Sequence, residues 1–264
     1  MVCIVGPGIE DEDDLELEEE LDEEDEYNTI DDEEEYAELL KTNHSKHITI
    51  LDPNYPEAFK NMCKPPLVLF YYGDISIISS MKNCIGYVGS RESSPYGNQM
   101  AKNICAGLVS YGYSIVSGLA RGIDTAATLG ALDAKGKAVA VLGNGIDYCY
   151  PSENKDLYER LKHEGLVISE YPGQTKPTHE SFPFRNRIIA ALSTGVVVGE
   201  ASKRSGTLIT VNFALGSNKD VGCVPFHANE NSACNRLIKE GAFVIESAED
   251  VLLMIGDSRG EKIA

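Results

Sequence analysis

The chain has 264 residues, which is enough for one large domain or for a domain with appendages. Hydrophobic residues make up 42% of it and can supply a sizeable core, while no run of about 18 apolar residues predicts a membrane span. Seven dispersed cysteines without a Cys-x-x-Cys pair predict reduced thiols in a cytoplasmic protein rather than a disulfide framework. Five scattered histidines show no metal-binding spacing, so we expect neither a metal nor a cofactor.

The net charge of −19 comes from one segment. Of the 42 Asp and Glu residues, 20 lie within residues 10–38, where there is no Lys or Arg. The rest of the chain holds 22 acidic and 23 basic residues and is electrically balanced, so an anionic ligand is compatible with it. An acidic, low-complexity stretch of this kind is typical of a solvated, disordered tail. The alternative is a tail that folds over a cationic site or docks a basic partner.

Alternating apolar and amphipathic stretches predict an α/β fold. An apolar run at residues 67–72 predicts a strand, and from residue 84 onward each apolar run is followed by a turn and a helical segment. This alternation predicts a doubly wound, mainly parallel sheet with helices on both faces. Further strands are expected at 84–89, 113–117, 137–142, 166–170, 195–199, 220–224 and 243–245. Helices are expected at 95–110, 122–135, 154–164, 184–193, 206–216, 232–240 and 248–255.

Composition divides the chain into four segments. They are an acidic segment at residues 1–40, an N-terminal extension of the sheet domain at 41–80, the doubly wound core at 81–257 and a C-terminal tail at 258–264.

Glycine and arginine recur where the predicted strands end. The first strand leads into GYVGSRESSPYG, with Arg91 at its tip, and the second leads into SGLARGIDTAA, with Arg121 between two glycines. Ligands of open α/β sheets bind at the carboxyl ends of the strands, where helix N-termini favour anions. Arg91 by itself is equally well explained as a surface residue on a loop, and Asp124 is better explained as a helix cap than as a catalytic group. The recurrence of glycines and cations at one edge nevertheless predicts a phosphate-binding surface.

Residues 181–210, SFPFRNRIIAALSTGVVVGEASKRSGTLIT, carry the densest set of cations. An aromatic–proline turn at residues 182–184 is expected to place Arg185 and Arg187 on the first turn of a helix. Lys203 and Arg204 are expected to open the next helix. Cations and free backbone N–H groups are thus predicted at two successive strand–helix junctions.

Aromatic side chains lie in the neighbouring predicted loops. Tyr148 and Tyr150 follow the third strand of the core, and Phe182 follows the fourth. Exposed aromatic rings beside arginines suit single-stranded nucleic acid, because bases stack on the rings while the cations bind the backbone. Tyrosines that pack the loop onto the sheet are an equally good interpretation of each one.

The chain resembles the DNA-processing protein A (DprA/Smf) family in six segments that occur in this order and spacing: GYVGSRESSPYG, IVSGLARGIDTAA, AVLGNGIDYCYP, ISEYP, FPFRNRIIAALS and EASKRSGTLIT. The resemblance covers about residues 50–255. It implies an extended Rossmann fold, a homodimer and sequence-independent binding of single-stranded DNA. It also implies a non-enzymatic role in natural transformation, which is to load the RecA recombinase on DNA protected by single-strand-binding protein.

The resemblance also implies which residues bind DNA phosphates. They are Gly89, Ser90, Arg91, Ser117, Gly118, Arg121, Phe184, Arg185, Asn186, Arg187, Lys203, Ser205 and Gly206, of which Asn186 and Arg187 are the candidates for bracing the pocket instead. The dimer contact is predicted at Leu237, Ile238 and Val244, with core packing as the alternative. Many members carry a helical N-terminal domain and a C-terminal winged-helix module, whereas this sequence has the acidic stretch and stops at Ala264.

Two other hypotheses stay open. One is a nucleotide-binding enzyme or sensor on a related phosphate-loop scaffold, such as a nucleoside-monophosphate glycohydrolase, although the signature PGGxGTxxE of that family is missing. Glu170, His179 and Glu200 are the conceivable acid–base set, but no nucleophile-elbow or paired-carboxylate motif supports it. The other is an autoinhibited protein in which the acidic segment mimics the charge of DNA.

Overall fold

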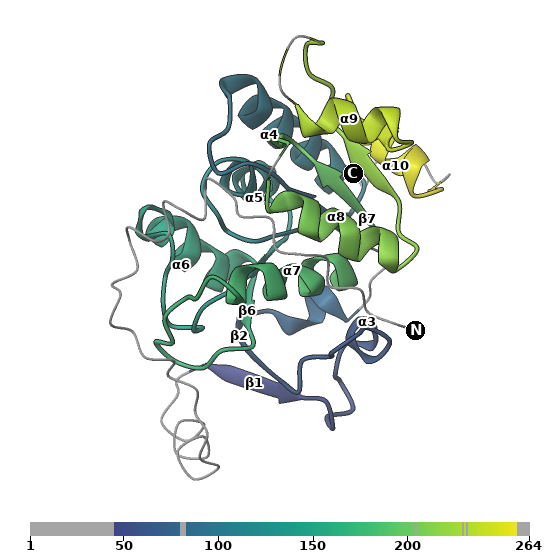
Figure 1. The fold of residues 1–264 in the computed structure, drawn as a ribbon. Coiled ribbons are helices and arrows are strands. Elements are labelled where there is room, and N and C mark those ends of the chain that lie inside the picture. The colour runs from purple at the N-terminus through teal and green to yellow at the C-terminus, as the bar shows by residue number, and fades with distance from the viewer. Residues whose placement is uncertain (1–44, 80–82, 204, 229, 231, 258–264) are drawn as a thin grey trace.

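A computed structural model describes residues 45–79, 83–203, 205–228, 230 and 232–257 (Figure 1). The predictions for the acidic segment, the C-terminal tail and Arg204 lie outside these residues. None of the described helices is long and apolar enough to cross a membrane.

Within the described residues, nine strands form one sheet in the order β1-β2-β6-β5-β4-β3-β7-β8-β9. The seven strands β6, β5, β4, β3, β7, β8 and β9 each run parallel to their neighbours in this order. At the other end of the sheet, β2 pairs antiparallel with β6, and β1 pairs antiparallel with β2. This confirms the predicted mainly parallel sheet. The strands are β1 Lys46–Thr49, β2 Val68–Gly73, β3 Cys84–Val88, β4 Ser114–Ser117, β5 Ala138–Val141, β6 Leu166–Ser169, β7 Gly195–Val198, β8 Val221–Cys223 and β9 Phe243–Val244.

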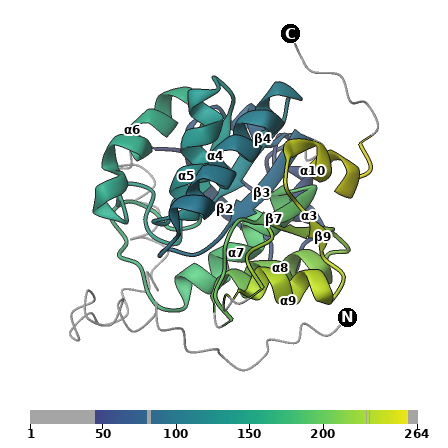
Figure 2. The same cartoon turned by 90° about the horizontal axis from the view of Figure 1, so that it is seen from above.

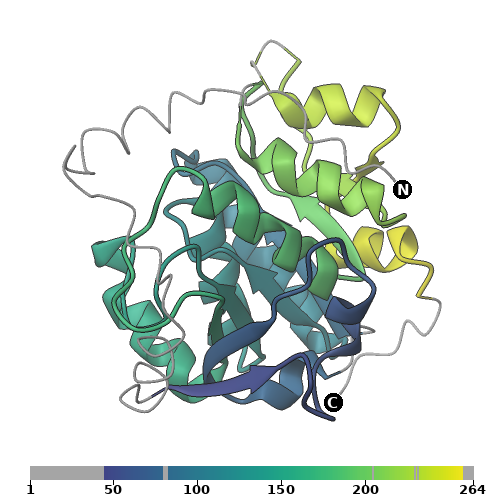
Figure 3. The ribbon, with the colours of Figure 1, turned by 60° about the horizontal axis from the view of Figure 1, so that its bottom comes forward.

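Helices cover both faces of the sheet (Figure 2). One face is covered by α4, α5, α6 and α10, and the other by α3, α7, α8 and α9. The helices are α3 Glu57–Lys60, α4 Pro95–Ser110, α5 Ile123–Asp133, α6 Lys155–Glu164, α7 Ser181–Leu192, α8 Thr207–Gly216, α9 Ala233–Lys239 and α10 Ala248–Met254. The connections of the described chain include the short 3-10 helices η1 Ile75–Ile78 and η3 Ser152–Asn154. Figure 3 shows β1 and β2 at one end of the sheet and the yellow α9 and α10 at the other.

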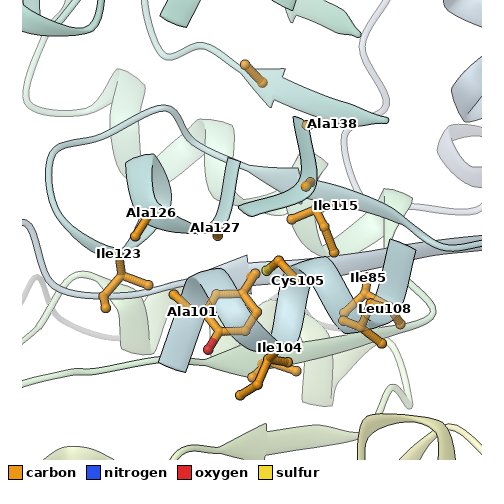
Figure 4. Close-up of a cluster of buried hydrophobic side chains, with 14 of the residues drawn as sticks. Ile85, Ala101, Ile104, Cys105, Leu108, Ile115, Ile123, Ala126, Ala127 and Ala138 are labelled. Carbon is orange, nitrogen blue, oxygen red and sulfur yellow. The ribbon is translucent and has the colours of Figure 1, made fainter. Parts of the chain in front are cut away.

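The core beneath α4 and α5 follows from helical spacing. Ala101, Ile104, Cys105 and Leu108 recur at the interval that places them on one face of α4, and all four are buried against the sheet (Figure 4). Small residues on α5 let the two helices touch, because a Cβ on Gly130 would lie 2.6 Å from the carbonyl oxygen of residue 102. Each buried Ile or Leu contributes about 1.5–3 kcal/mol relative to an exposed one.

Helix α7 starts earlier than the sequence predicts. The expected turn at residues 182–184 is wrong, because the helix begins at Ser181 and this segment is its first turn. Reciprocal hydrogen bonds between Thr178 and Ser181 stabilise the start, and Pro183 is tolerated there because the first turn of a helix has no partner for its N–H groups. Arg185 therefore lies one turn deeper in the helix than predicted.

The chain order creates a switch point beside β3. From β3 the chain proceeds to β4, β5 and β6 on one side, and it then crosses to β7, β8 and β9 on the other. In open α/β sheets the ligand crevice lies outside the carboxyl ends of the strands at such a reversal. The corresponding position in this fold is between the loops that follow β3 and β7.

Candidate nucleic-acid interface

Three loops meet at the switch point, and we call them the switch-point loops: residues 89–94 after β3, 118–122 after β4 and 199–206 after β7. The Ser90 N–H donates to the Glu200 carbonyl at 2.8 Å, and the Ser90 carbonyl accepts from the Ile123 N–H at 3.1 Å. Gly122 has φ 71°, and a Cβ on it would lie 2.4 Å from the Ser90 carbonyl oxygen. These contacts tie the described residues of the three loops to one another.

Helix α4 begins with a carboxylate on its first turn. The Glu200 side chain accepts hydrogen bonds from the Ser94 N–H at 2.9 Å and from the Ser94 Oγ at 2.8 Å. Ser94 Oγ in turn accepts from the Gly97 N–H at 3.0 Å, and Pro95 occupies the first helical position as predicted. An internal anion thus lies where the dipole of α4 favours negative charge.

The loop after β4 is held from below by Asp124. Its carboxylate accepts from the N–H groups of Gly118 at 2.9 Å and Ala120 at 3.4 Å, so the prediction of a simple helix cap is wrong. Between them, the buried Leu119 adopts φ 60°, which is unusual for a residue other than glycine. Burial raises the pKa of the Asp124 carboxyl, and the charge of Arg185 opposes that shift.

Arg185 lies under the same loop. Its Nη1 donates to the carbonyl oxygens of Gly118, at 2.8 Å, and of Val141, and its side chain is buried. A Cβ on Gly118 would lie 2.6 Å from Arg185 Nη2, so a glycine is required where the guanidinium passes. Burial lowers the pKa of Arg185 to about 10, which still leaves it charged at neutral pH. Asn186 accepts from its Nε at 3.1 Å.

Arg187 is also buried and is fully engaged by the protein. It forms a bidentate ion pair with Glu170, with both N–O distances 2.6 Å, and it donates to the Lys64 carbonyl at 3.1 Å. Its guanidinium lies 3.7 Å from the ring centroid of Phe184, which is partly exposed. Direct phosphate contacts from Arg185 and Arg187 stay predictions, because the structure shows both arginines bonded inside the fold.

An aromatic–cationic platform lies beside the switch-point loops. The ring of Phe182 has the Arg91 guanidinium 5.5 Å away and the Arg185 guanidinium 5.9 Å away. The centroid of the Tyr150 ring lies 5.6 Å from that of Phe182. Gly143 leaves room for the Phe182 ring, since a Cβ on Gly143 would lie 2.7 Å from that ring. Arg91, Phe182 and Tyr150 are half-buried, so each keeps part of its surface open to a ligand. Sequence reasoning recognised the aromatic residues but not their stacking with Arg91.

The other predicted site residues fall into two groups. Ser117 and Ser205 are buried, with Ser117 Oγ bonded to the Tyr87 carbonyl at 2.7 Å and Ser205 Oγ to Thr207 at 2.9 Å. Lys203 and Arg121 are exposed, and Arg121 pairs with Glu153 at 2.9 Å. Gly89, Ser90 and Gly206 lie half-buried on the switch-point loops.

The predicted dimer residues lie at the β9 end of the sheet. Leu237 is 8% exposed and belongs to the core, whereas Ile238 is half-buried and packs on it. Val244 is 47% exposed and lies on the edge strand β9 beside the exposed Phe243.

Two members of the conceivable acid–base set, Glu170 and Glu200, are bonded to other side chains. Glu170 is held by Arg187, and Glu200 by Ser94. Within the described part of the chain, no three His, Cys, Asp or Glu side chains are grouped so that they could hold a metal ion.

Comparisons with known proteins point to one family. A model of the family described as DNA recombination-mediator protein A matches residues 46–256. Protein Smf of Synechocystis sp. is 39% identical over 226 residues, which are 84% of this chain and 57% of that protein. This chain therefore spans less than two thirds of that relative.

Two solved structures resemble the fold. DNA processing protein A of Streptococcus pneumoniae aligns with a TM-score of 0.78 and 38% identity over 84% of this chain and 77% of that chain. DNA processing protein A of Helicobacter pylori, whose structure gives its single-stranded DNA binding mode, aligns with a TM-score of 0.72 and 28% identity. That alignment covers 80% of this chain and 95% of the other.

Proposed function

The chain belongs to the family of DNA recombination-mediator protein A, and we propose that it binds single-stranded DNA without sequence preference and loads a RecA-type recombinase on that DNA. Phosphates bind at the switch-point loops, chiefly to Arg91 and Lys203, and a base stacks at the platform formed by Phe182 and Tyr150. No covalent chemistry is required of the protein in this role.

The stacking of Arg91 on Phe182 is the observation that carries this proposal. A half-buried guanidinium 5.5 Å from a half-buried ring offers one partner for a phosphate and one for a base within a single nucleotide's reach. A double helix hides its base faces, so the platform favours single strands. The single-stranded DNA binding mode described for the Helicobacter pylori relative supports the same ligand class.

A homodimer is part of the same proposal. Phe243 and Val244 on the edge strand β9 are 45% and 47% exposed, and Leu253 on the neighbouring α10 is 75% exposed. Among the described strands β9 is the last of the sheet, and a strand edge with exposed apolar side chains invites pairing with a second chain. Sedimentation of the full chain tests this, and a monomer at micromolar concentration contradicts it.

Fluorescence anisotropy of a labelled oligo-dT across a salt series tests DNA binding. We expect binding that weakens steeply with salt, because each neutralised phosphate of a single strand contributes about −0.7 to the slope of log K against log salt. Double-stranded DNA should compete poorly. Equal competition by duplex DNA contradicts the role of the aromatic platform, and no binding at low salt contradicts the proposal.

Variants at the site sharpen this test. Arg91→Ala should weaken binding about tenfold and reduce the salt slope by about 0.7, since it removes one phosphate contact. Phe182→Leu should weaken binding by a similar factor, because stacking contributes about 1–3 kcal/mol per base, with an unchanged salt slope. Lys239→Ala, on α9 away from the switch-point loops, is the matched control and should bind normally.

The nucleotide-binding enzyme stays as the alternative. The Glu200 carboxylate already occupies the first turn of α4, where a nucleotide phosphate would otherwise bind. Release of free base from a panel of nucleoside monophosphates would favour that alternative over the DNA-binding proposal.

A further inference from the structure

Glu200 lies on the loop after β7 and forms hydrogen bonds with both ends of the loop after β3. Its carbonyl accepts from Ser90 N–H at 2.8 Å, and its carboxylate accepts from Ser94 N–H and Oγ at 2.9 and 2.8 Å. The three residues between these anchors, 91–93, include Arg91. Glu200 itself lies three residues before Lys203 on the loop after β7. One residue thus ties the backbone beneath one proposed phosphate ligand to the loop that carries the other.

Gly97 shows that the fold keeps space for this carboxylate. A Cβ on Gly97 would lie 2.1 Å from Glu200 Oε2, although Gly97 is inside α4, where alanine is the better helix former. Helix propensity therefore disfavours a glycine at this position. The absence of a side chain on Gly97 leaves the space that the Glu200 carboxylate fills.

We propose that Glu200 is a positioning residue for DNA binding: its carboxylate holds the loop after β3 so that Arg91 meets the DNA backbone. This rests on the proposed function, because it concerns how the proposed DNA site is built. Positioning requires a hydrogen-bond acceptor at residue 200 rather than a negative charge, because the N–H and the Oγ–H of Ser94 both donate to it.

Gly97→Ala tests the inference without changing Glu200 or any DNA ligand. The added methyl group must displace the flexible carboxylate, while the helix itself tolerates alanine. We expect oligo-dT to bind about tenfold more weakly, as in Arg91→Ala, with a melting temperature within about 4 °C of the wild type. In an Arg91→Ala background, Gly97→Ala should have no further effect, because the residue through which it acts is gone.

Two substitutions of Glu200 complete the test. Glu200→Ala should weaken binding as Gly97→Ala does, and the two changes together should be no worse than either one. Glu200→Gln keeps an oxygen acceptor and removes a negative charge near DNA, so it should bind at least as tightly as the wild type. Glu164→Ala is the matched control, since Glu164 ends α6 at the opposite edge of the sheet.

Several outcomes would overturn the inference. They are normal binding by a folded Gly97→Ala variant, full additivity of its effect with that of Arg91→Ala, or binding by Glu200→Gln as weak as that by Glu200→Ala. Amide hydrogen exchange of residues 90–94 gives a readout without DNA, because losing the carboxylate should accelerate exchange at Ser94. If the wild type binds no DNA, the proposed function fails, whereas unchanged exchange in Gly97→Ala shows that the positioning inference itself fails.

Discussion

At the scale of single residues, the arginines of the site divide into two kinds that their sequence positions do not distinguish. Arg185 and Arg187 are buried and bonded to carbonyl or carboxylate groups, while Arg91 and Arg121 lie at the surface. Burying a guanidinium is costly unless its donors are satisfied, which is why the buried pair carries so many internal hydrogen bonds. The buried arginines hold the loops and helices around the switch point together, and the surface arginines are the ones that our proposal assigns to DNA phosphates.

Arg185→Ala should therefore act on stability before it acts on binding. It leaves the Gly118 and Val141 carbonyls without their donor and removes the positive charge that offsets the buried Asp124 carboxylate, so we expect a loss of about 3–5 kcal/mol in the free energy of unfolding. Chemical denaturation measures this. Arg91→Ala, at the surface, should change stability by only about 0.5 kcal/mol. Equal stabilities of the two variants would contradict the division.

At the scale of elements, α7 connects the site to the core. Its first turns carry Phe182 and Arg185, and its later residues 188–192 are buried against the sheet. Its last carbonyls, of Ala190 and Ala191, accept from Lys219 Nζ at 2.6 and 2.7 Å. A lysine at this end satisfies carbonyls that have no partner within the helix and complements its dipole.

Lys219→Met should lower the free energy of unfolding by about 1–3 kcal/mol, because the carbonyls of two buried residues lose their donor. DNA affinity should stay unchanged, since Lys219 precedes β8 at the amino edge of the sheet, opposite the site. Thermal denaturation with the anisotropy assay separates the two effects. Lys239→Met on α9 is the exposed control, and an equal loss of stability there would contradict the capping role.

At the scale of the whole molecule, the charge of the chain is divided between segments. The acidic residues 10–38 precede a nearly neutral body that carries the proposed DNA site. If this segment competes with DNA for the switch-point cations, deleting residues 1–38 should raise oligo-dT affinity at low salt and have little effect at high salt. The salt series of the two proteins measures this. Unchanged affinity at low salt would contradict the autoinhibited form. As a control for the deletion, residues 1–38 added as a separate peptide should lower the affinity of the shortened protein for oligo-dT.

Periodicity and turn residues in the sequence were sufficient to predict the α/β fold and most element positions. Apolar runs of strand length, each followed by a helical repeat, leave few arrangements other than a doubly wound sheet, and α4 was predicted at its observed bounds. The start of α7 was missed, because the Thr178–Ser181 hydrogen bonds that stabilise it compete with the strong turn signal of proline.

The sequence by itself also determined that cations and glycines gather at one edge, because the carboxyl ends of parallel strands share that edge. Only the tertiary structure decided which cations face outward. Whether an arginine is buried depends on carbonyls and carboxylates from distant segments. The Val141 carbonyl and the Asp124 carboxylate compensate the charge of Arg185, and the Glu170 carboxylate pairs with Arg187. The same holds for Glu200, whose partner Ser94 lies 106 residues away, a separation that no local pattern in the sequence encodes.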